Sequence, residues 1–200
     1  MSREHTSFIL GYHGCTKSTG EEVLAGRLAL EPSSNPWDWL GPGVYFWEAD
    51  PQRAWEWAED MVKRKGTSEP FVLGAIIDLG NCLDLMARGD LELLRSAYDS
   101  LSEFHAKSGK MDDLPVNKPI NDDDPDDLLR FLDRAVVEHL HEIMDDFGEP
   151  SFDTVRGLFT EGEPLFPGSG FKSRTHTQIA VCNRSCIKGY FRVPPDDLTG

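Results

Sequence analysis

The sequence predicts an α+β domain, because its expected strands gather near both ends of the chain and its expected helices fill the middle. Neither a repeated βαβ order nor a glycine-rich phosphate-binding motif is present. The chain of 200 residues suits one domain that carries a sizeable insertion. Short apolar runs that fit strands lie at 8–10, 44–47, 71–77, 82–85, 179–182 and 187–193.

Two helices of the first third have recognisable boundaries. Asp50 is a suitable N-cap, and Gly66 follows the last apolar turn, so we expect a helix between them. Ser18 and Glu21 have the spacing of a capping box, which predicts a shorter helix that ends at Gly26.

Residues 90–147 are expected to form a mostly helical, acidic insertion that begins at an Asp90 cap. From Asp99 to Glu149 there are 15 acidic and 5 basic residues, so this stretch carries −10 of the total charge of −15. The charge is either a solvated helix face or a docking surface for a neutralising or regulatory protein. Two apolar stripes at helical spacing support the helices: Leu91, Leu94, Tyr98, Leu101 and His105, then Leu128, Leu132, Ala135, Val136, His139, Leu140 and Ile143.

The segment 152–170 is expected to be a long loop, because it contains four glycines and two prolines. Loops of this kind often carry functional residues.

The sequence gives no reason to expect a membrane or a metal. No apolar run has the length of a membrane span and the amino terminus is polar, so a cytoplasmic protein is expected. Cys182 and Cys186 do not have the spacing of a common zinc site, and we expect reduced thiols. His139 and His141 are two positions apart and do not share a helix face.

Three segments together suggest chemistry. They are Gly-Tyr-His-Gly-Cys-Thr at 11–16, Leu-Gly-Pro-Gly-Val-Tyr-Phe at 40–46, and Thr-His-Thr-Gln-Ile-Ala-Val at 175–181. In this order they resemble the ADP-ribosyltransferase superfamily, in the His-Tyr-Glu branch of diphtheria toxin and the poly(ADP-ribose) polymerases. The resemblance covers about residues 8–60, 71–85 and 150–193. It implies split antiparallel sheets with NAD⁺ as the substrate.

The resemblance also implies roles for individual residues. His13 matches the histidine that hydrogen-bonds a ribose of NAD⁺, and Gly14 would offer its backbone to the nicotinamide carboxamide. Tyr45 matches the aromatic residue that stacks on the nicotinamide, and Tyr12 is a second candidate for that environment. Gln178 stands where the branch has its glutamate. Each residue alone would be read as structural, and only the ordered set points to a site.

A glutamine in the third position changes the expected chemistry. Cleavage of the glycosidic bond builds positive charge on the ribose. Gln178 can hold the ribose hydroxyl, but it cannot deprotonate an incoming nucleophile. Three possibilities follow. The nucleophile needs little activation, another residue acts as the base, or the protein has lost transferase activity. Glu161 is our candidate for the base, with Glu163 and Asp153 as alternatives.

Basic and aromatic residues around these segments offer further contacts. Three cations are candidates to bind the pyrophosphate or an anionic substrate, and they fit ordinary surface charge equally well: Arg156, Lys172 and Arg174. Trp37 and Trp39 lie in a turn-rich stretch that could cover the adenosine half of NAD⁺.

These expectations favour a mono-ADP-ribosyltransferase that modifies a protein or a nucleic acid. An NAD⁺ glycohydrolase that uses water, and a non-catalytic module that binds NAD⁺, ADP-ribose or a protein, are the alternatives. A compact enzyme of this kind suggests an intracellular toxin or defence effector that a protein partner holds in check.

Overall fold

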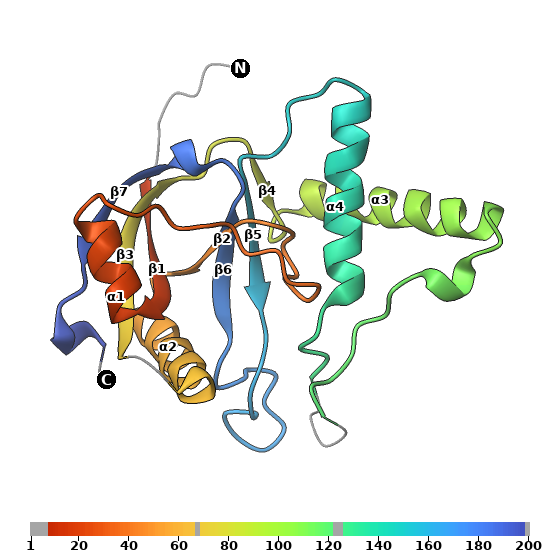
Figure 1. The fold of residues 1–200 in the computed structure, drawn as a ribbon. Coiled ribbons are helices and arrows are strands. Elements are labelled where there is room, and N and C mark those ends of the chain that lie inside the picture. The colour runs from red at the N-terminus through yellow and green to blue at the C-terminus, as the bar shows by residue number, and fades with distance from the viewer. Residues whose placement is uncertain (1–7, 67–68, 122–125, 199–200) are drawn as a thin grey trace.

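The computed structural model describes residues 8–66, 69–121 and 126–198, and it is an α+β fold with one seven-stranded sheet (Figure 1). The strands are β1 (Phe8–Thr16), β2 (Val44–Glu48), β3 (Pro70–Asp78), β4 (Cys82–Asp84), β5 (Thr154–Phe159), β6 (His176–Val181) and β7 (Ile187–Arg192). The α-helices of the described ranges are α1 (Lys17–Leu24), α2 (Pro51–Lys65), α3 (Arg88–Lys107) and α4 (Phe131–Asp146). The predicted α+β class is confirmed.

The sheet is continuous, whereas the resemblance implied split sheets. Its strand order is β4-β5-β6-β2-β1-β3-β7. The two halves are joined by a short ladder between β1 and β2, which pairs Gly11 with Glu48 and Tyr12 with Trp47. By contrast, β1 pairs with β3 along its whole length. The β1–β2 ladder is therefore much shorter than the β1–β3 ladder, and β1 and β2 diverge beyond it. We call this short ladder the sheet joint.

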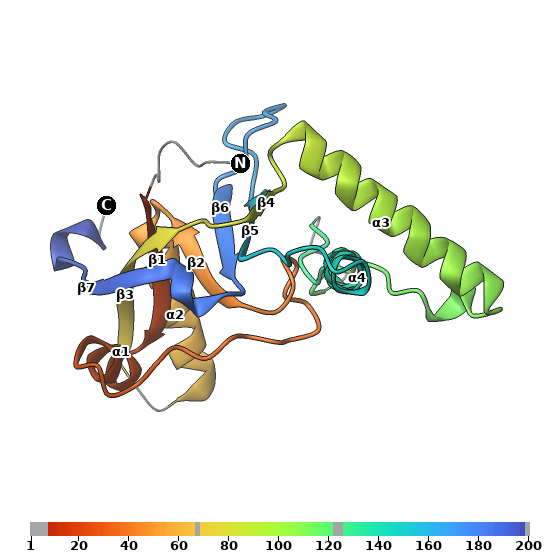
Figure 2. The ribbon, with the colours of Figure 1, turned by 90° about the horizontal axis from the view of Figure 1, so that it is seen from above.

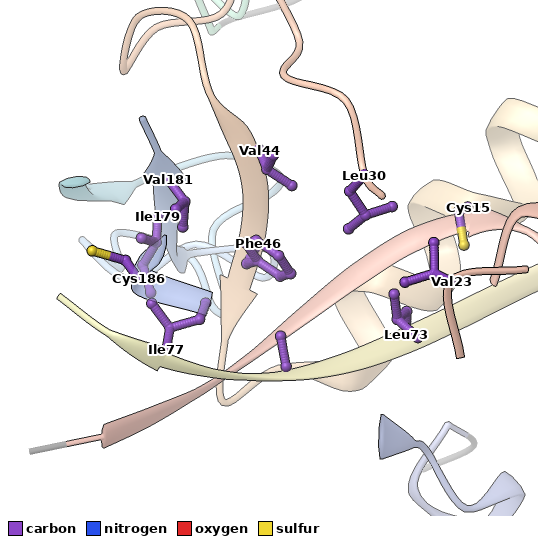
Figure 3. Close-up of a cluster of buried hydrophobic side chains, with 11 residues drawn as sticks. Cys15, Val23, Leu30, Val44, Phe46, Leu73, Ile77, Ile179, Val181 and Cys186 are labelled. Atoms are coloured by element: carbon purple, nitrogen blue, oxygen red, sulfur yellow. The ribbon is translucent and has the colours of Figure 1, made fainter. Parts of the chain in front are cut away.

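Apolar side chains from both halves of the sheet meet in one core. Phe46 and Ile179 come from β2 and β6, and Leu73 and Ile77 come from β3; all four are fully buried (Figure 3). This shared core holds the two halves together even though only a short ladder joins them.

The acidic insertion is the connection between two parallel strands. β4 and β5 pair in parallel, although the sequence showed no βαβ order, and a parallel pair needs a long crossover. Helices α3 and α4 form that crossover, and α3 extends away from the sheet (Figures 1 and 2). α4 buries Val136, Val137 and Leu140 in a core shared with Val155 of β5. Among the described residues, the predicted insertion thus contains two α-helices, of which α4 packs on the sheet.

Helix α3 departs from its predicted start and face. It begins at Arg88, and the Asp90 carboxylate accepts the backbone N–H of Asp84 at 2.8 Å instead of capping the helix. Leu91 is 47% exposed and the buried residue of α3 is Ala97, so the helix packs on a narrower face than the predicted stripe.

The first strand is longer than predicted. β1 continues through its glycines to Thr16, whose hydroxyl caps α1 by accepting the backbone N–H of Thr19 at 3.2 Å. The capping box predicted at Ser18 and Glu21 is therefore wrong. The boundaries of α2 are confirmed, since Asp50 caps its start and Gly66, at φ 69°, follows its end.

The predicted loop 152–170 contains a strand, because β5 occupies Thr154–Phe159. The loop was predicted partly because of Gly157, a residue type that is uncommon inside strands. A Cβ at this position would lie 2.6 Å from the ring of Trp39, so the glycine makes room for an indole that crosses the strand. In the described ranges, no helix is long and apolar enough to span a bilayer.

Candidate functional site

A cavity of about 280 Å³ opens where β1 and β2 diverge. Its lining includes five of the seven predicted site residues: His13, Gly14, Tyr45, Glu161 and Gln178. They come from β1, β2, β6 and the loop after β5. The sheet joint therefore brings together side chains that are far apart in the sequence.

His13 spans the gap between the two diverging strands. Its Nδ1 lies 2.8 Å from the backbone oxygen of Tyr45. A carbonyl oxygen only accepts, so Nδ1 carries the proton and Nε2 keeps its lone pair. Burial lowers the pKa of His13, which favours the neutral ring. His13 therefore offers a hydrogen-bond acceptor to a hydroxyl in the cavity.

Tyr45 is fixed by the turn that precedes its strand. Its hydroxyl donates to the backbone oxygen of Gly41 at 2.8 Å and accepts the N–H of Leu40 at 3.0 Å. Burial raises the pKa of Tyr45 well above its usual range, so the phenol stays neutral. With its polar end occupied, the residue offers its ring to the cavity as a rigid apolar surface.

Gln178 is oriented by an indole from the loop before β2. Trp39 Nε1 donates to Gln178 Oε1 at 2.7 Å. An indole nitrogen is only a donor, so the oxygen of the amide must face it. Within the described residues, no group accepts a hydrogen bond from the Gln178 NH₂.

Gly14 has a packing role that is independent of any ligand. A Cβ at this position would lie 2.4 Å from the backbone oxygen of Ala54 and 3.1 Å from the ring of Trp57. The glycine lets α2 pack directly on β1. This contact places the first turns of α2 at the edge of the cavity.

Glu161 is buried and its charge is paired. Arg53, in the first turn of α2, donates to its carboxylate from Nε at 3.0 Å and also from Nη2. Both hydrogen bonds go to Oε1, so the guanidinium already occupies that carboxylate oxygen. Glu161 therefore lies at the cavity, where the sequence predicted a base, but as the ion-pair partner of Arg53.

Two predicted residues lie outside the cavity. Tyr12 neighbours His13 along the strand and faces the other side, where its ring packs edge-on to Phe191 with 6.2 Å between centroids. Arg156 is on β5, not in a loop, and its guanidinium donates to Glu48 at 2.6 and 2.8 Å and to Asp84 at 3.0 Å. The predictions that Tyr12 and Arg156 bind NAD⁺ are not supported by this placement.

The other candidate cations are also paired. Lys172 contacts the carboxylate of Asp126, and Arg174 lies 3.8 Å from Glu56. The cation that does line the cavity is Arg53, which the sequence analysis missed. Arg53 could have been found from the sequence, because it lies in the first turn of α2, the helix whose start at Asp50 was predicted.

His176 is a second residue that the sequence analysis missed. It lies two positions before Gln178 on β6, and alternation along a strand places both on the same face. Its ring stacks on Phe159 with 5.6 Å between centroids and lines the cavity. His176 belongs to the same sequence motif as Gln178. Because side chains two positions apart on a strand share a face, the sequence could have predicted that both residues line the site.

The remaining wall comes from two loops. Trp37 and Trp39 of the stretch before β2 line the cavity, as do Ile120 and Leu128 of the acidic insertion. In the described part of the chain, no three His, Cys, Asp or Glu side chains gather as metal ligands.

Comparisons with known proteins do not assign a family. No family model and no curated protein match the chain. One solved structure is similar, the crystal structure of the M. tuberculosis MbcT–MbcA toxin–antitoxin complex. The match has a TM-score of 0.40 and 12% identity, and it covers 96% of this chain and 87% of that chain. At this level of similarity the functional argument depends on the cavity itself.

Proposed function

We propose that the protein cleaves NAD⁺ and transfers the ADP-ribose to a protein or nucleic-acid acceptor, as a mono-ADP-ribosyltransferase. The observation that carries the proposal is the convergence of His13, Tyr45 and Gln178 on one cavity. If these three side chains lay in separate regions of the fold, no single cavity could bind the nicotinamide riboside, and the proposal would fail.

The cavity residues suit the two halves of a nicotinamide riboside. The rigid ring of Tyr45 provides a stacking surface for the nicotinamide. The Nε2 lone pair of His13 accepts a ribose hydroxyl. The Gln178 NH₂, which Trp39 turns away from itself, donates to a ribose oxygen. These groups orient the sugar for loss of nicotinamide, and orientation supplies much of the rate.

A specific observation favours a second reaction, hydrolysis of NAD⁺. Gln178 has no charge, and the Glu161 carboxylate is paired with Arg53. Without an available carboxylate base, a nucleophile that is weak but abundant, namely water, competes with a macromolecular acceptor.

The experiment that tests the proposal uses NAD⁺ labelled in its adenylate half. The protein is incubated with this NAD⁺ and cell lysate, and the label is followed to macromolecules and to small products. We expect label on macromolecules with the wild-type chain and none with His13→Ala, whose ring would be missing from the strand joint. Free ADP-ribose without macromolecular label would establish the glycohydrolase instead.

A binding module that does not cleave NAD⁺ is the third alternative. Calorimetry separates it from the two enzymes. NAD⁺ binding without turnover would establish the module as an NAD⁺ receptor. The absence of binding would contradict both enzymatic proposals and leave a role in protein interaction.

We further propose that the enzyme acts as an intracellular toxin or defence effector that a protein partner neutralises. The acidic insertion is the surface on which we place this partner, because α3 extends from the body and exposes Leu91 and Phe104. Toxicity on expression, lost in His13→Ala, is the expected result. Co-expression with the genes beside its own would then identify the neutralising protein.

A further inference from the structure

The cavity contains a buried histidine nitrogen that the roles above do not use. The side chain of His176 is 1% exposed, and its Nδ1 lies 2.7 Å from the backbone oxygen of Arg174. The carbonyl accepts, so Nδ1 is protonated and Nε2 is a lone-pair acceptor. No group among the described residues donates to this Nε2. Buried polar atoms are normally paired, so an unpaired one on a residue that lines a cavity points to a ligand.

Trp47 offers the complementary group in the same cavity. Its indole Nε1–H is buried and has no acceptor among the residues that the structure describes. The rings of Trp47 and His176 are neighbours, with 6.2 Å between their centroids. The two neighbouring rings thus carry one unused donor and one unused acceptor.

We propose that Trp47 and His176 form the acceptor subsite, which binds a hydroxyl nucleophile and moves its proton to His176 Nε2. The inference rests on the proposed function and names its acceptor class: an alcohol group of a macromolecule, or water. His176 then performs the proton transfer that Gln178 cannot perform.

The proposed step forms one bond and breaks one bond at C1′ of the ribose. The hydroxyl oxygen forms a bond to C1′ of the ribose while the C1′–N bond to nicotinamide breaks, and that electron pair stays on the departing nicotinamide. The hydroxyl proton moves to His176 Nε2, and the resulting imidazolium later returns it to solvent. The products are the O-linked ADP-ribose, nicotinamide and one proton.

A hydroxyl fits this subsite better than a carboxylate or a guanidinium does. It can accept from Trp47 Nε1–H and donate to His176 Nε2 at once. A carboxylate has no proton to give to His176, and a guanidinium has no lone pair for Trp47. Both would leave one of the two buried groups unpaired.

Charged groups from two elements surround the imidazole. Burial lowers the pKa of His176, and the positive charge of Arg53 on α2 acts in the same direction. Asp50 at the start of α2 and Glu161 after β5 oppose this change. The ring is therefore neutral before the reaction. After proton transfer, the Glu161 carboxylate, 3.8 Å from Nδ1, stabilises the imidazolium.

His176→Gln tests the inference, because glutamine can accept a hydrogen bond but not a proton. Label transfer and NAD⁺ hydrolysis are measured between pH 5.5 and 9, together with NAD⁺ affinity and thermal unfolding. We expect kcat to fall by about 10²-fold, as for the loss of a general base, with NAD⁺ affinity within about twofold of wild type. The decline of the wild-type rate toward acid pH should become smaller in this variant, and the remainder belongs to His13, whose ring must also stay neutral. His105→Gln, at the end of α3, is the matched control.

Two further measurements complete the test. Trp47→Phe keeps the aromatic packing and should raise the KM of the acceptor more than that of NAD⁺. Modified macromolecules are treated with neutral hydroxylamine, which cleaves esters of carboxylates but not links to hydroxyls. We expect the label on macromolecules to resist hydroxylamine. If free ADP-ribose is the only labelled product, water is the hydroxyl nucleophile, and this result also supports the subsite.

Clear results would overturn the inference. They are an unchanged rate and pH profile in His176→Gln, or a label that hydroxylamine releases. Should that variant fail to fold, a histidine-selective ¹⁵N spectrum of the wild-type chain decides, because a protonated His176 Nε2 at pH 7 contradicts the proposal. A wild-type protein that does not consume NAD⁺ removes the proposed function as well, whereas an active His176→Gln removes only this inference.

Discussion

Trp39 Nε1 donates a 2.7 Å hydrogen bond to Gln178 Oε1, across 139 positions of sequence. The contact fixes which end of the amide faces the cavity. From the sequence, the Gln178 amide was expected to hold a ribose hydroxyl through either its oxygen or its nitrogen, and the structure directs the oxygen to an indole. Gln178 therefore presents N–H donors, where a glutamate would present only acceptors.

Trp39→Phe should weaken catalysis without unfolding the protein. Phenylalanine keeps an aromatic ring against Phe159, which lies 5.1 Å away between centroids, but it removes the donor to Gln178. One neutral hydrogen bond is worth about 0.5–1.5 kcal/mol, so we expect kcat/KM for NAD⁺ to fall by about 2- to 13-fold. Initial rates and thermal unfolding measure the two effects. Trp55→Phe, an indole outside the cavity, should leave the rate unchanged, and an equal loss there would contradict this role for Trp39.

Gln178→Glu should increase NAD⁺ hydrolysis. A carboxylate at this position still accepts from Trp39 and adds a negative charge beside the developing positive charge of the ribose. We expect a rise of about tenfold, which corresponds to about 1.4 kcal/mol of transition-state stabilisation. Release of nicotinamide measures it.

Thr177→Glu is the matched control for that experiment. It adds the same charge one residue away, on the opposite face of β6. No increase is expected there. A decrease in Gln178→Glu would mean that the N–H donors of the amide are essential for binding the substrate.

Local signals predicted most of the secondary structure. Asp50 and Gly66 gave the correct ends of α2, because caps depend on neighbouring residues. The strand β5 was missed because Gly157 is required by Trp39, a residue distant in sequence. The parallel pairing of β4 with β5 was missed for a similar reason, since the two strands are separated by the whole acidic insertion.

The site was predictable where it depended on motif residues and unpredictable where it depended on partners. His13, Tyr45 and Gln178 line one cavity as expected. The sequence did not reveal that Arg53 would neutralise Glu161, or that Arg156 would be paired with two carboxylates. A charge becomes a binding group only when the fold leaves it unpaired, and pairing is a tertiary property.

Mild acid should destabilise the fold through its buried histidines. Burial lowers the pKa of His13, His141 and His176, whereas in the unfolded chain each titrates near 6.5. Below about pH 6.5 the unfolded chain binds protons that the folded chain does not. The free energy of unfolding should then fall as the pH decreases, by at most about 1.4 kcal/mol per pH unit for each histidine. Above pH 6.5 this contribution is fully present.

His141 allows that effect to be measured away from the cavity. It lies on α4, its ring is 5.7 Å from that of Phe152, and its variant should keep NAD⁺ turnover. Urea unfolding at pH 7.5 and 5.5 should show a smaller loss of stability in His141→Gln than in the wild type. Equal losses in both chains would mean that His141 is not a source of the acid sensitivity, and His105→Gln provides the comparison for an unrelated histidine.

A pair of variants at Tyr45 separates the ring from the hydroxyl. Tyr45→Phe loses the hydrogen bonds to Leu40 and Gly41 but keeps the ring, so we expect a loss of about 1–3 kcal/mol in unfolding free energy and nearly normal NAD⁺ affinity. Tyr45→Ala loses the stacking surface as well. Stacking of a base on an aromatic side chain is worth about 1–3 kcal/mol, so NAD⁺ affinity should fall by about 5- to 150-fold. Calorimetric titration and urea unfolding of both variants distinguish these effects. If Tyr45→Phe weakens NAD⁺ binding as much as Tyr45→Ala does, then the turn that the hydroxyl holds, and not the ring, recognises the nicotinamide.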